Sequence, residues 1–342
     1  HIAWLARSGS YSDVYAYDGA SISQLSFTSD FNEQNLFASE KYIAWNVRNY
    51  IDGDNVYLFD GTNASKVSNS GGDYGEYRPK IHGERMVWGA TNYNSSGSSG
   101  DIVLYDIASG IATGLTPPLT SGFTTNDQNP SIYGDFVAFS ATWGSSKLYI
   151  YDIINDEYDA VVSAIANGPE LNDKYTVYDY SGSVRVYDRA TDSYKSVGSG
   201  SSVQLDGDFV VWTHDSGVTN YTDSVYLYDA SDAAGTAKLI ASNVEYSNAG
   251  VSIHGNLIAF SGWDGNDLEI YIYDIGCGTT TKLTNNSYAD RDPMVRGQKI
   301  VWSYFDGPGE NGDEEIMLAT ATPGPDPDYC PGSYFIIAAA NG

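Results

Sequence analysis

The sequence predicts an all-β fold: a single β-propeller of four-stranded blades followed by a strand-like tail. The first observation is a phrase of four short apolar runs, rich in Ile, Val, Tyr and Phe and separated by Gly, Asp and Asn, at residues 251–284. Runs of this kind are typical of strands. The second observation is that this phrase recurs along nearly the whole chain with a period of about 43 residues, which is the signature of a propeller. The third is that no segment keeps a helical period, so almost no helix is expected.

The second run of each repeat ends in a large aromatic residue, which marks the repeats along the chain. The eight marks are Trp4, Trp45, Trp88, Phe139, Tyr178, Trp212, Phe260 and Trp302. The second and third runs are apolar at nearly every position, as expected for strands buried on both faces between neighbouring blades. The marks favour eight blades, with seven as the alternative, because the first repeat lacks its first run and the last lacks a clear fourth run.

The end of the chain leaves the repeat. We expect a propeller over residues 1–320, a Pro-rich linker over 321–332 and a strand over 333–342. Placed before His1, the tail reads FIIAAANG/HIAWLA, which matches the first two runs of the seventh repeat. The tail is therefore predicted to supply the missing strand of the first blade, within the same chain or by donation to a neighbouring subunit, with a frayed terminus as the alternative. The residues expected to make this contact are Tyr334, Phe335, Ile336 and Ile337.

Composition limits the partners and the location. The net charge of −27, from 44 acidic and 17 basic residues, excludes nucleic acid and anionic lipid surfaces as partners. No apolar run is long enough for a transmembrane helix, so membrane insertion is not expected. The chain begins inside a strand-like run without an initiator Met or a signal peptide, as in a mature chain or a record that lacks its start. N-glycosylation sequons begin at Asn63, Asn94, Asn220 and Asn285. Together these features favour an extracellular or cell-surface location.

The two cysteines, Cys277 and Cys330, are predicted to form a disulfide bond. Cys277 lies in the turn after the third run of the seventh repeat, and Cys330 lies just beyond the third run of the eighth. A bond between these neighbouring blades would hold the base of the tail on the ring, and in the chain-entropy model it would add about 4 kcal/mol.

Residues that recur in the same slot of many repeats are predicted to be structural. His82 and His254 both occupy an Ile-His-Gly turn, where other repeats carry Tyr, Asn, Asp or Arg, so a solvent-side turn position is expected rather than a metal ligand. The third run ends in Asp in seven repeats, and this Asp is expected to bond its own turn backbone. These residues are Asp18, Asp60, Asp106, Asp152, Asp188, Asp229 and Asp274. HExxH, GxSxG and P-loop motifs are absent.

Candidate binding residues are those that do not recur, in the loops between the second and third runs. One acidic loop contains Asp52 and Asp54, and another contains Asp264, Asp267 and Glu269. Such clusters provide the oxygen ligands that calcium prefers, with a solvated acidic rim as the alternative; no other cofactor is expected. Trp143 and Trp263 lie in the same class of loop. An exposed Trp beside Asp and Asn suits stacking on a sugar, and packing onto a neighbouring loop is the alternative.

The repeats also resemble a known family. The phrase NPSIYGDFVAF at 129–139, which is followed by the run LYIYD, and the phrase DPMVRGQKIVW at 292–302 resemble the TolB-like (WD40-like) propeller repeats of bacterial and archaeal cell-surface proteins. The resemblance covers residues 1–320, although the Gly-His and Trp-Asp pairs of eukaryotic WD40 repeats are absent. It implies extracellular scaffolding, adhesion or surface-layer roles, usually without chemistry.

The first functional expectation is therefore a non-catalytic extracellular structural or adhesive module that is not an enzyme. It would contact cell-surface protein or glycan, or further copies of itself in a filament, tube or layer. The alternatives are a polysaccharide-binding or polysaccharide-cleaving propeller, favoured by the loop Trp and acidic residues, and a periplasmic scaffold that binds a protein.

Overall fold

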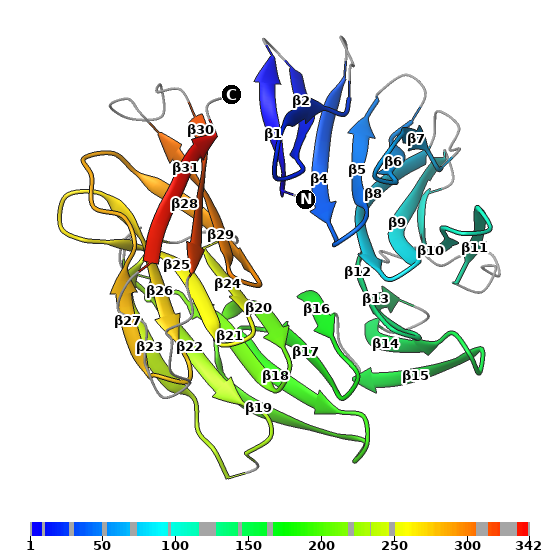
Figure 1. Cartoon of the computed structure of the whole chain (residues 1–342). Helices are drawn as coiled ribbons and strands as arrows, with labels where there is room; N and C mark the ends of the chain where they lie inside the picture. The colour runs from blue at the N-terminus through cyan, green and yellow to red at the C-terminus, as the bar shows by residue number, and fades with distance from the viewer. Residues whose placement is uncertain are drawn as a thin grey trace. The chain divides into compact units, whose positions relative to one another are not determined.

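The computed structural model describes residues 2–8, 11–26, 31–49, 53–68, 74–94, 97–115, 128–142, 146–162, 167–217, 222–232, 234–245, 250–305, 314–321 and 334–340. These residues form strands and turns and contain no helix (Figure 1). Accordingly, no membrane-spanning helix occurs in this part of the chain. The chain divides into two compact units, His1–Thr176 and Val177–Gly342.

Antiparallel sheets follow one another along the chain, and we number them as blades in sequence order. Blade 1 contains β1 (Ile2–Ser8), β2 (Tyr11–Tyr17) and β3 (Ile22–Gln24). Blade 2 contains β4 (Asn32–Ala38), β5 (Ile43–Arg48), β6 (Asn55–Phe59) and β7 (Ala64–Lys66). Blade 3 contains β8 (Tyr74–His82), β9 (Arg85–Asn94), β10 (Gly97–Asp106) and β11 (Ile111–Gly114). Blade 4 contains β12 (Gln128–Tyr133), β13 (Phe136–Thr142), β14 (Ser146–Asp152) and β15 (Glu157–Val162).

The remaining sheets continue the same order. Blade 5 contains β16 (Asn167–Leu171), β17 (Tyr175–Tyr180), β18 (Ser183–Asp188) and β19 (Ser193–Ser199). Blade 6 contains β20 (Ser201–Asp206), β21 (Phe209–His214), β22 (Asp223–Asp229) and β23 (Lys238–Val244). Blade 7 contains β24 (Val251–His254), β25 (Leu257–Trp263), β26 (Leu268–Asp274) and β27 (Thr279–Lys282), and the ladder pair Val244–Gly262 extends the sheet of blade 6 into it. Blade 8 contains β28 (Asp290–Arg296), β29 (Lys299–Phe305), β30 (Glu314–Ala321) and β31 (Tyr334–Ala340). The predicted all-β fold with eight blades is thus confirmed.

The hydrophobic core lies between successive sheets, as the unalternating strand patterns predict. One cluster joins Ile270 and Ile272 of blade 7 to Ile300 and Trp302 of blade 8. Most aromatic marks are fully buried. Six of them are at most 2% exposed: Trp45, Trp88, Phe139, Tyr178, Trp212 and Trp302. In several blades the mark stacks on a Tyr of the next strand, as Trp45 does on Tyr57 with ring centroids 5.9 Å apart. The recurrence of a large aromatic residue in each repeat therefore follows from inter-blade packing.

A β-bulge recurs between the first two strands of the blades and was not predicted from the sequence. Its residue has a positive φ and precedes the aromatic mark by ten positions, as Arg78 precedes Trp88 and Asp292 precedes Trp302. The same conformation occurs at Asn35, Asn129, Gly168 and Ser202. Gly, Asn and Asp tolerate this left-handed conformation, whereas Arg and Ser carry strain there. The bulge turns the first strand at the same point in each blade.

The Asp at the end of the third strand holds the following turn, as predicted. In blade 1, Asp18 Oδ1 accepts hydrogen bonds from the N–H groups of Ala20 and Ser21, at 2.7 and 2.8 Å. Equivalent bonds to turn N–H groups are made by Asp60, Asp106, Asp152, Asp188, Asp229 and Asp274. These bonds favour the carboxylate, and those from the N–H groups of Asn63 and Thr62 lower the pKa of Asp60.

The Ile-His-Gly turn has a more specific role than the predicted solvent-side position. His82 Nδ1 accepts a hydrogen bond from Gly134 N of the next blade at 3.0 Å, and His254 Nδ1 accepts one from Gly297 N at 3.1 Å. The slot therefore links neighbouring blades. Asp206 makes the same contact in blade 6, where its Oδ2 accepts from Gly255 N, whereas Arg296 in the same slot has no acceptor atom.

The tail does not occupy the predicted position. Its strand β31 pairs antiparallel with β30, with Tyr334 opposite Ala321 and Ala340 opposite Ile316 (Figure 1). Tyr334, Phe335, Ile336 and Ile337 thus belong to the outer strand of blade 8, and blade 1 has three strands in the described residues. The physical reason is proximity: blade 8 lacks a fourth run of its own, and returning to the adjacent edge closes only a short loop. Residues 322–332 of the linker lie outside the described residues.

Candidate functional site

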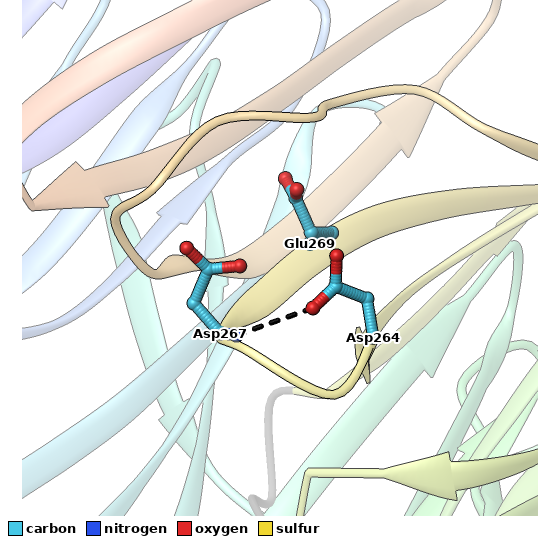
Figure 2. A group of neighbouring side chains, drawn as sticks. All are labelled: Asp264, Asp267 and Glu269. Atoms are coloured by element: carbon cyan, nitrogen blue, oxygen red, sulfur yellow. Dashed lines mark hydrogen bonds between the residues drawn. The ribbon is translucent and has the colours of Figure 1, made fainter.

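Three predicted calcium ligands meet in the loop between β25 and β26 of blade 7. Candidate ligand atoms of Asp264, Asp267 and Glu269 all lie within 4.8 Å of one another (Figure 2). It is the one group of three or more His, Cys, Asp or Glu side chains with such spacing among the described residues. We call these three residues the carboxylate cluster. The prediction of a cluster at this loop is therefore met by the geometry, whereas cation binding remains a prediction.

The local sequence Asp-Gly-Asn-Asp folds this loop. Asp264 Oδ1 accepts hydrogen bonds from Asn266 N at 2.8 Å and from Asp267 N at 3.2 Å, and Asp264 N donates to Asp267 O at 3.1 Å. Gly265 has a φ of 110°, a positive value that glycine adopts readily. This turn carries the carboxylates of Asp264 and Asp267 next to Glu269, the second residue of the third strand of the blade.

Lys282, at the end of β27, is the positive charge within the cluster. Its Nζ lies 2.7 Å from Asp264 Oδ2 and 3.1 Å from Glu269 Oε1. The hydrogen bond from Lys282, together with those from the Asn266 and Asp267 N–H groups, lowers the pKa of Asp264 to about 2. Asp264 is therefore an anion throughout the neutral range.

Glu269 is fully buried and links blade 7 to blade 8. Its Oε2 accepts from the Thr284 hydroxyl at 2.6 Å, and its Oε1 accepts from Asn286 N at 3.0 Å. Asn286 Nδ2 then donates to Asp290 Oδ2 at 2.6 Å, and Trp302 Nε1 donates to Asp290 Oδ1 at 2.6 Å. Burial raises the pKa of Asp290 to about 6, although these hydrogen bonds oppose the shift.

Asp267 is the least satisfied member of the cluster. It is 9% exposed, and its Oδ1 is buried without a hydrogen-bond partner, although Oδ2 accepts from Asn266 Nδ2 at 3.1 Å. Burial raises the pKa of Asp267, and the nearby charges of Glu269 and Asp264 raise it further. A buried oxygen of this kind is costly unless something else compensates its charge.

Other predicted site residues lie apart from the cluster or outside the described residues. Trp263 is the last residue of β25, directly before Asp264, and is half-buried. Asp54 lies at the equivalent loop of blade 2 and accepts a bond from Asn49 N at 2.9 Å. Asp52 and Trp143 lie outside the described residues. Of these residues, Trp263 adjoins the carboxylate cluster, because it directly precedes Asp264 in the sequence.

The predicted glycosylation sites remain predictions. Asn63 and Asn285 are exposed, and Asn285 Oδ1 accepts a hydrogen bond from Lys282 beside the cluster at 2.8 Å. The side chain of Asn94 and the whole of Asn220 lie outside the described part.

Of the two cysteines predicted to form a disulfide bond, Cys277 lies within the described residues. Cys277 is disulfide-bonded, and no free cysteine occurs in the described residues. Cys330 is the only other cysteine of the sequence and lies outside the described residues, so this pairing remains a prediction.

Sequence reasoning missed the residues that complete the site, which lie on β27, in the segment that follows it and at the start of β28. These are Lys282, Thr284, Asn286 and Asp290. Lys282 and Thr284 belong to the Thr-Lys-Leu-Thr run, where Thr284 matches Ser26 and Ser68 of other repeats. Val14 N donates to Ser26 Oγ at 2.8 Å, and Ile270 N donates to Thr284 Oγ1 at 2.9 Å. The recurring hydroxyl was thus a usable signal for the frame of the site.

Comparisons with known proteins identify the fold. No protein-family model and no curated protein sequence match the chain. A puromycin-hydrolyzing peptidase of Mycobacterium tuberculosis matches at 11% identity with a TM-score of 0.57, over 91% of this chain and 53% of that one. Oligogalacturonate lyase in complex with manganese matches at 10% identity with a TM-score of 0.55, over 94% and 96% of the two chains. The β-propeller domain of the Trilobed protease from Pyrococcus furiosus matches at 14% identity with a TM-score of 0.50, over 77% and 82%.

The chain spans less than half of an acylaminoacyl peptidase that it also matches, covering 44% of that protein. The expectation of a non-catalytic structural or adhesive module is corrected by these comparisons, because the matching propellers are mostly found in proteins named as peptidases, hydrolases or a lyase. At these identities the likeness shows the fold alone. The chain has a β-propeller fold, and its sequence phrases resemble TolB-like (WD40-like) repeats.

Proposed function

We propose that this chain is a polysaccharide-binding or polysaccharide-cleaving propeller whose ligand contacts the β25–β26 loop. The observation that carries the proposal is the position of Trp263 directly before a cluster of three carboxylates. Sugar sites combine an aromatic face, which stacks on the ring, with a few polar groups that accept hydrogen bonds from hydroxyls. The loop supplies the half-buried Trp263 and the exposed carboxylate of Asp264, which hydrogen bonds from Asn266 N and Asp267 N hold in place.

The comparisons support a carbohydrate ligand by analogy. The match to oligogalacturonate lyase covers nearly the full length of both chains, 94% and 96%. The matches to peptidases cover about half of those proteins, as in the 53% of the puromycin-hydrolyzing peptidase. A ligand that binds the propeller alone is therefore more consistent with the match to oligogalacturonate lyase than with the matches to the peptidases.

An extracellular location is part of this proposal. Disulfide bonds persist in oxidising compartments, and Cys277 is disulfide-bonded. Location outside the cell would also bring the chain to polysaccharides, which are abundant there. Detection of the native protein in the cytosolic fraction, with none in the medium or envelope, would contradict it.

The test is a binding and turnover screen of the full chain. Polygalacturonate and neutral polysaccharides are offered with and without calcium, and both retention and product release are measured. We expect binding to at least one polysaccharide and a loss of about tenfold in affinity in Trp263→Ala, because a stacking face is removed. Tyr194→Ala on blade 5, which removes an aromatic side chain that is 52% exposed, is the matched control and should bind as the wild type does.

Two outcomes contradict the proposal. The first is an absence of both binding and turnover for every polysaccharide in either buffer. The second is turnover of peptide substrates without any polysaccharide binding, which would place the chain with the peptidase propellers.

A further inference from the structure

The carboxylate cluster has more negative than positive charge around it. Asp264, Asp267 and Glu269 contribute three carboxylates, and Lys282 is the ammonium that pairs with two of them. Glu269 has no exposed surface and Asp267 is 9% exposed, so water screens their mutual repulsion poorly. The site would be electrostatically more favourable with additional positive charge.

Asp267 provides an observation that does not depend on charge counting. Its Oδ1 atom is buried and has no hydrogen-bond partner. Figure 2 shows one oxygen of Asp267 on the side that faces Asp264 and Glu269. In the described residues neither an N–H nor a hydroxyl donates to Asp267 Oδ1, and leaving this atom without a partner costs free energy. A cation at this place would satisfy Asp267 while also neutralising its neighbours.

We propose that the β25–β26 loop is a calcium site whose protein ligands are the carboxylates of Asp264, Asp267 and Glu269. Calcium accepts about six to eight oxygen ligands in irregular geometry, whereas magnesium requires a near-octahedral arrangement and gives up its water reluctantly. Three carboxylates from one short stretch of chain suit the first ion better than the second. Water or a bound ligand supplies the remaining coordination positions.

Lys282 is the internal competitor of the cation. Its Nζ donates to Asp264 Oδ2 at 2.7 Å and to Asn285 Oδ1 at 2.8 Å, and it lies 3.1 Å from Glu269 Oε1. An ammonium has three N–H groups, so these three acceptors use all of them. Calcium therefore has to displace Lys282 from two carboxylates, which the flexible four-carbon side chain permits. It follows that Lys282 lowers the calcium affinity of the site.

The test is calorimetric titration of the purified full chain with calcium, in the absence of polysaccharide. We expect one calcium per chain in the wild type, binding at least about tenfold tighter in Lys282→Met, and at least about tenfold weaker in Asp267→Asn. Magnesium should bind more weakly than calcium in each protein. Asp54→Asn is the matched control, because Asp54 lies in the equivalent loop of blade 2 and outside the cluster.

The proposal is wrong if Lys282→Met and Lys282→Gln, each shown to be folded by its thermal unfolding curve, bind calcium no more tightly than the wild type. It is also wrong if Asp54→Asn weakens binding as much as Asp267→Asn does. Since no polysaccharide is present, loss of polysaccharide binding with intact calcium binding would count against the proposed function alone.

Discussion

The junction between blades 7 and 8 and the junction between blades 2 and 3 have the same frame but different polar contents. In both, a hydroxyl two residues beyond the fourth strand accepts a bond from an N–H of the third strand: Val56 N to Ser68 Oγ at 2.8 Å, and Ile270 N to Thr284 Oγ1 at 2.9 Å. The difference lies in the residue directly before that N–H, which is Asn55 in blade 2 and Glu269 in blade 7.

The next blade extends this difference. At the blade 7–8 junction the network continues to Asp290, whose Oδ1 accepts from Trp302 Nε1 at 2.6 Å. At the blade 2–3 junction the equivalent residues are Glu76 and Trp88, and both Glu76 Oε2 and Trp88 Nε1 are buried without a hydrogen-bond partner. The repeat therefore fixes where polar groups lie, whereas single substitutions decide whether they pair. The carboxylate cluster forms at blade 7, where Glu269 stands in place of Asn55, whereas Lys282 matches Lys66 of blade 2.

The largest expected difference between the junctions follows removal of Glu269 or of the equivalent Asn55. Glu269→Ala removes the acceptor of the Thr284 hydroxyl and of Asn286 N, together with one of the three acceptors of Lys282, and should cost about 3–5 kcal/mol. Asn55→Ala removes the bond from Nδ2 to Gly53 O and should cost about 1–2 kcal/mol. Urea unfolding followed by tryptophan fluorescence measures both.

Glu269→Gln is the control, because the amide keeps an acceptor oxygen and loses only the charge. Its cost should fall between the other two. Equal costs for Glu269→Ala and Asn55→Ala would show that the polar network of blade 7 adds nothing to the frame that all blades share.

The sequence was sufficient for the frame and insufficient for the site. Trp45 and Trp302 occur at equivalent positions because inter-blade packing requires a large side chain there, so the spacing reveals the fold. The contact of Lys282 with Asp264 depends instead on how the β25–β26 loop folds. Lys282 lies opposite Tyr271, and Lys66 of blade 2 lies opposite Tyr57 in the same register, so the repeat places the Lys but does not show that Asp264 and Glu269 lie beside it.

The tail shows a second limit of sequence comparison. Residues 333–342 resemble the first run of the seventh repeat, which pointed to blade 1. The vacant outer edge of β30 is much closer along the chain, and β31 pairs there. Similarity of sequence indicated that the segment is a strand, whereas chain connectivity determined which sheet it joins.

The next largest effect is expected at the blade 2–3 junction, where the melting temperature should depend on pH through Glu76. Burial raises the pKa of Glu76 above its ordinary value of 4.5, so the folded state holds a proton that the unfolded state has already released. The stability of the wild type therefore falls as the pH rises through and above this value. Glu76→Gln has no proton to lose, so its melting temperature should exceed that of the wild type at pH 8. The expected difference is about 2–4 °C, the shift that about 1 kcal/mol gives in a protein of this size. Below pH 4 the two melting temperatures should approach each other.

Thermal unfolding at a series of pH values measures this difference. Glu40→Gln, which changes an exposed acid of blade 2, is the control and should leave the melting temperature within error of the wild type. A difference for Glu76→Gln that stays constant from pH 4 to pH 8 would mean that its charge is not responsible.

The smallest expected effect concerns the bulge residues of the two junctions, Arg78 in blade 3 and Asp292 in blade 8. Both have a positive φ, of 56° and 52°, but Asp tolerates this conformation better than Arg. Arg78→Gly should therefore raise the free energy of unfolding by up to about 1 kcal/mol, whereas Asp292→Gly should change it little.

Gly168→Ala, at the same bulge in blade 5, is the control and should lower the free energy of unfolding by about 1 kcal/mol. No atom lies within 4 Å of the added Cβ, so the loss would be conformational. If Arg78→Gly is as unstable as Gly168→Ala, contacts of the Arg78 side chain outweigh backbone strain, and the recurring bulge cannot be what distinguishes the two junctions.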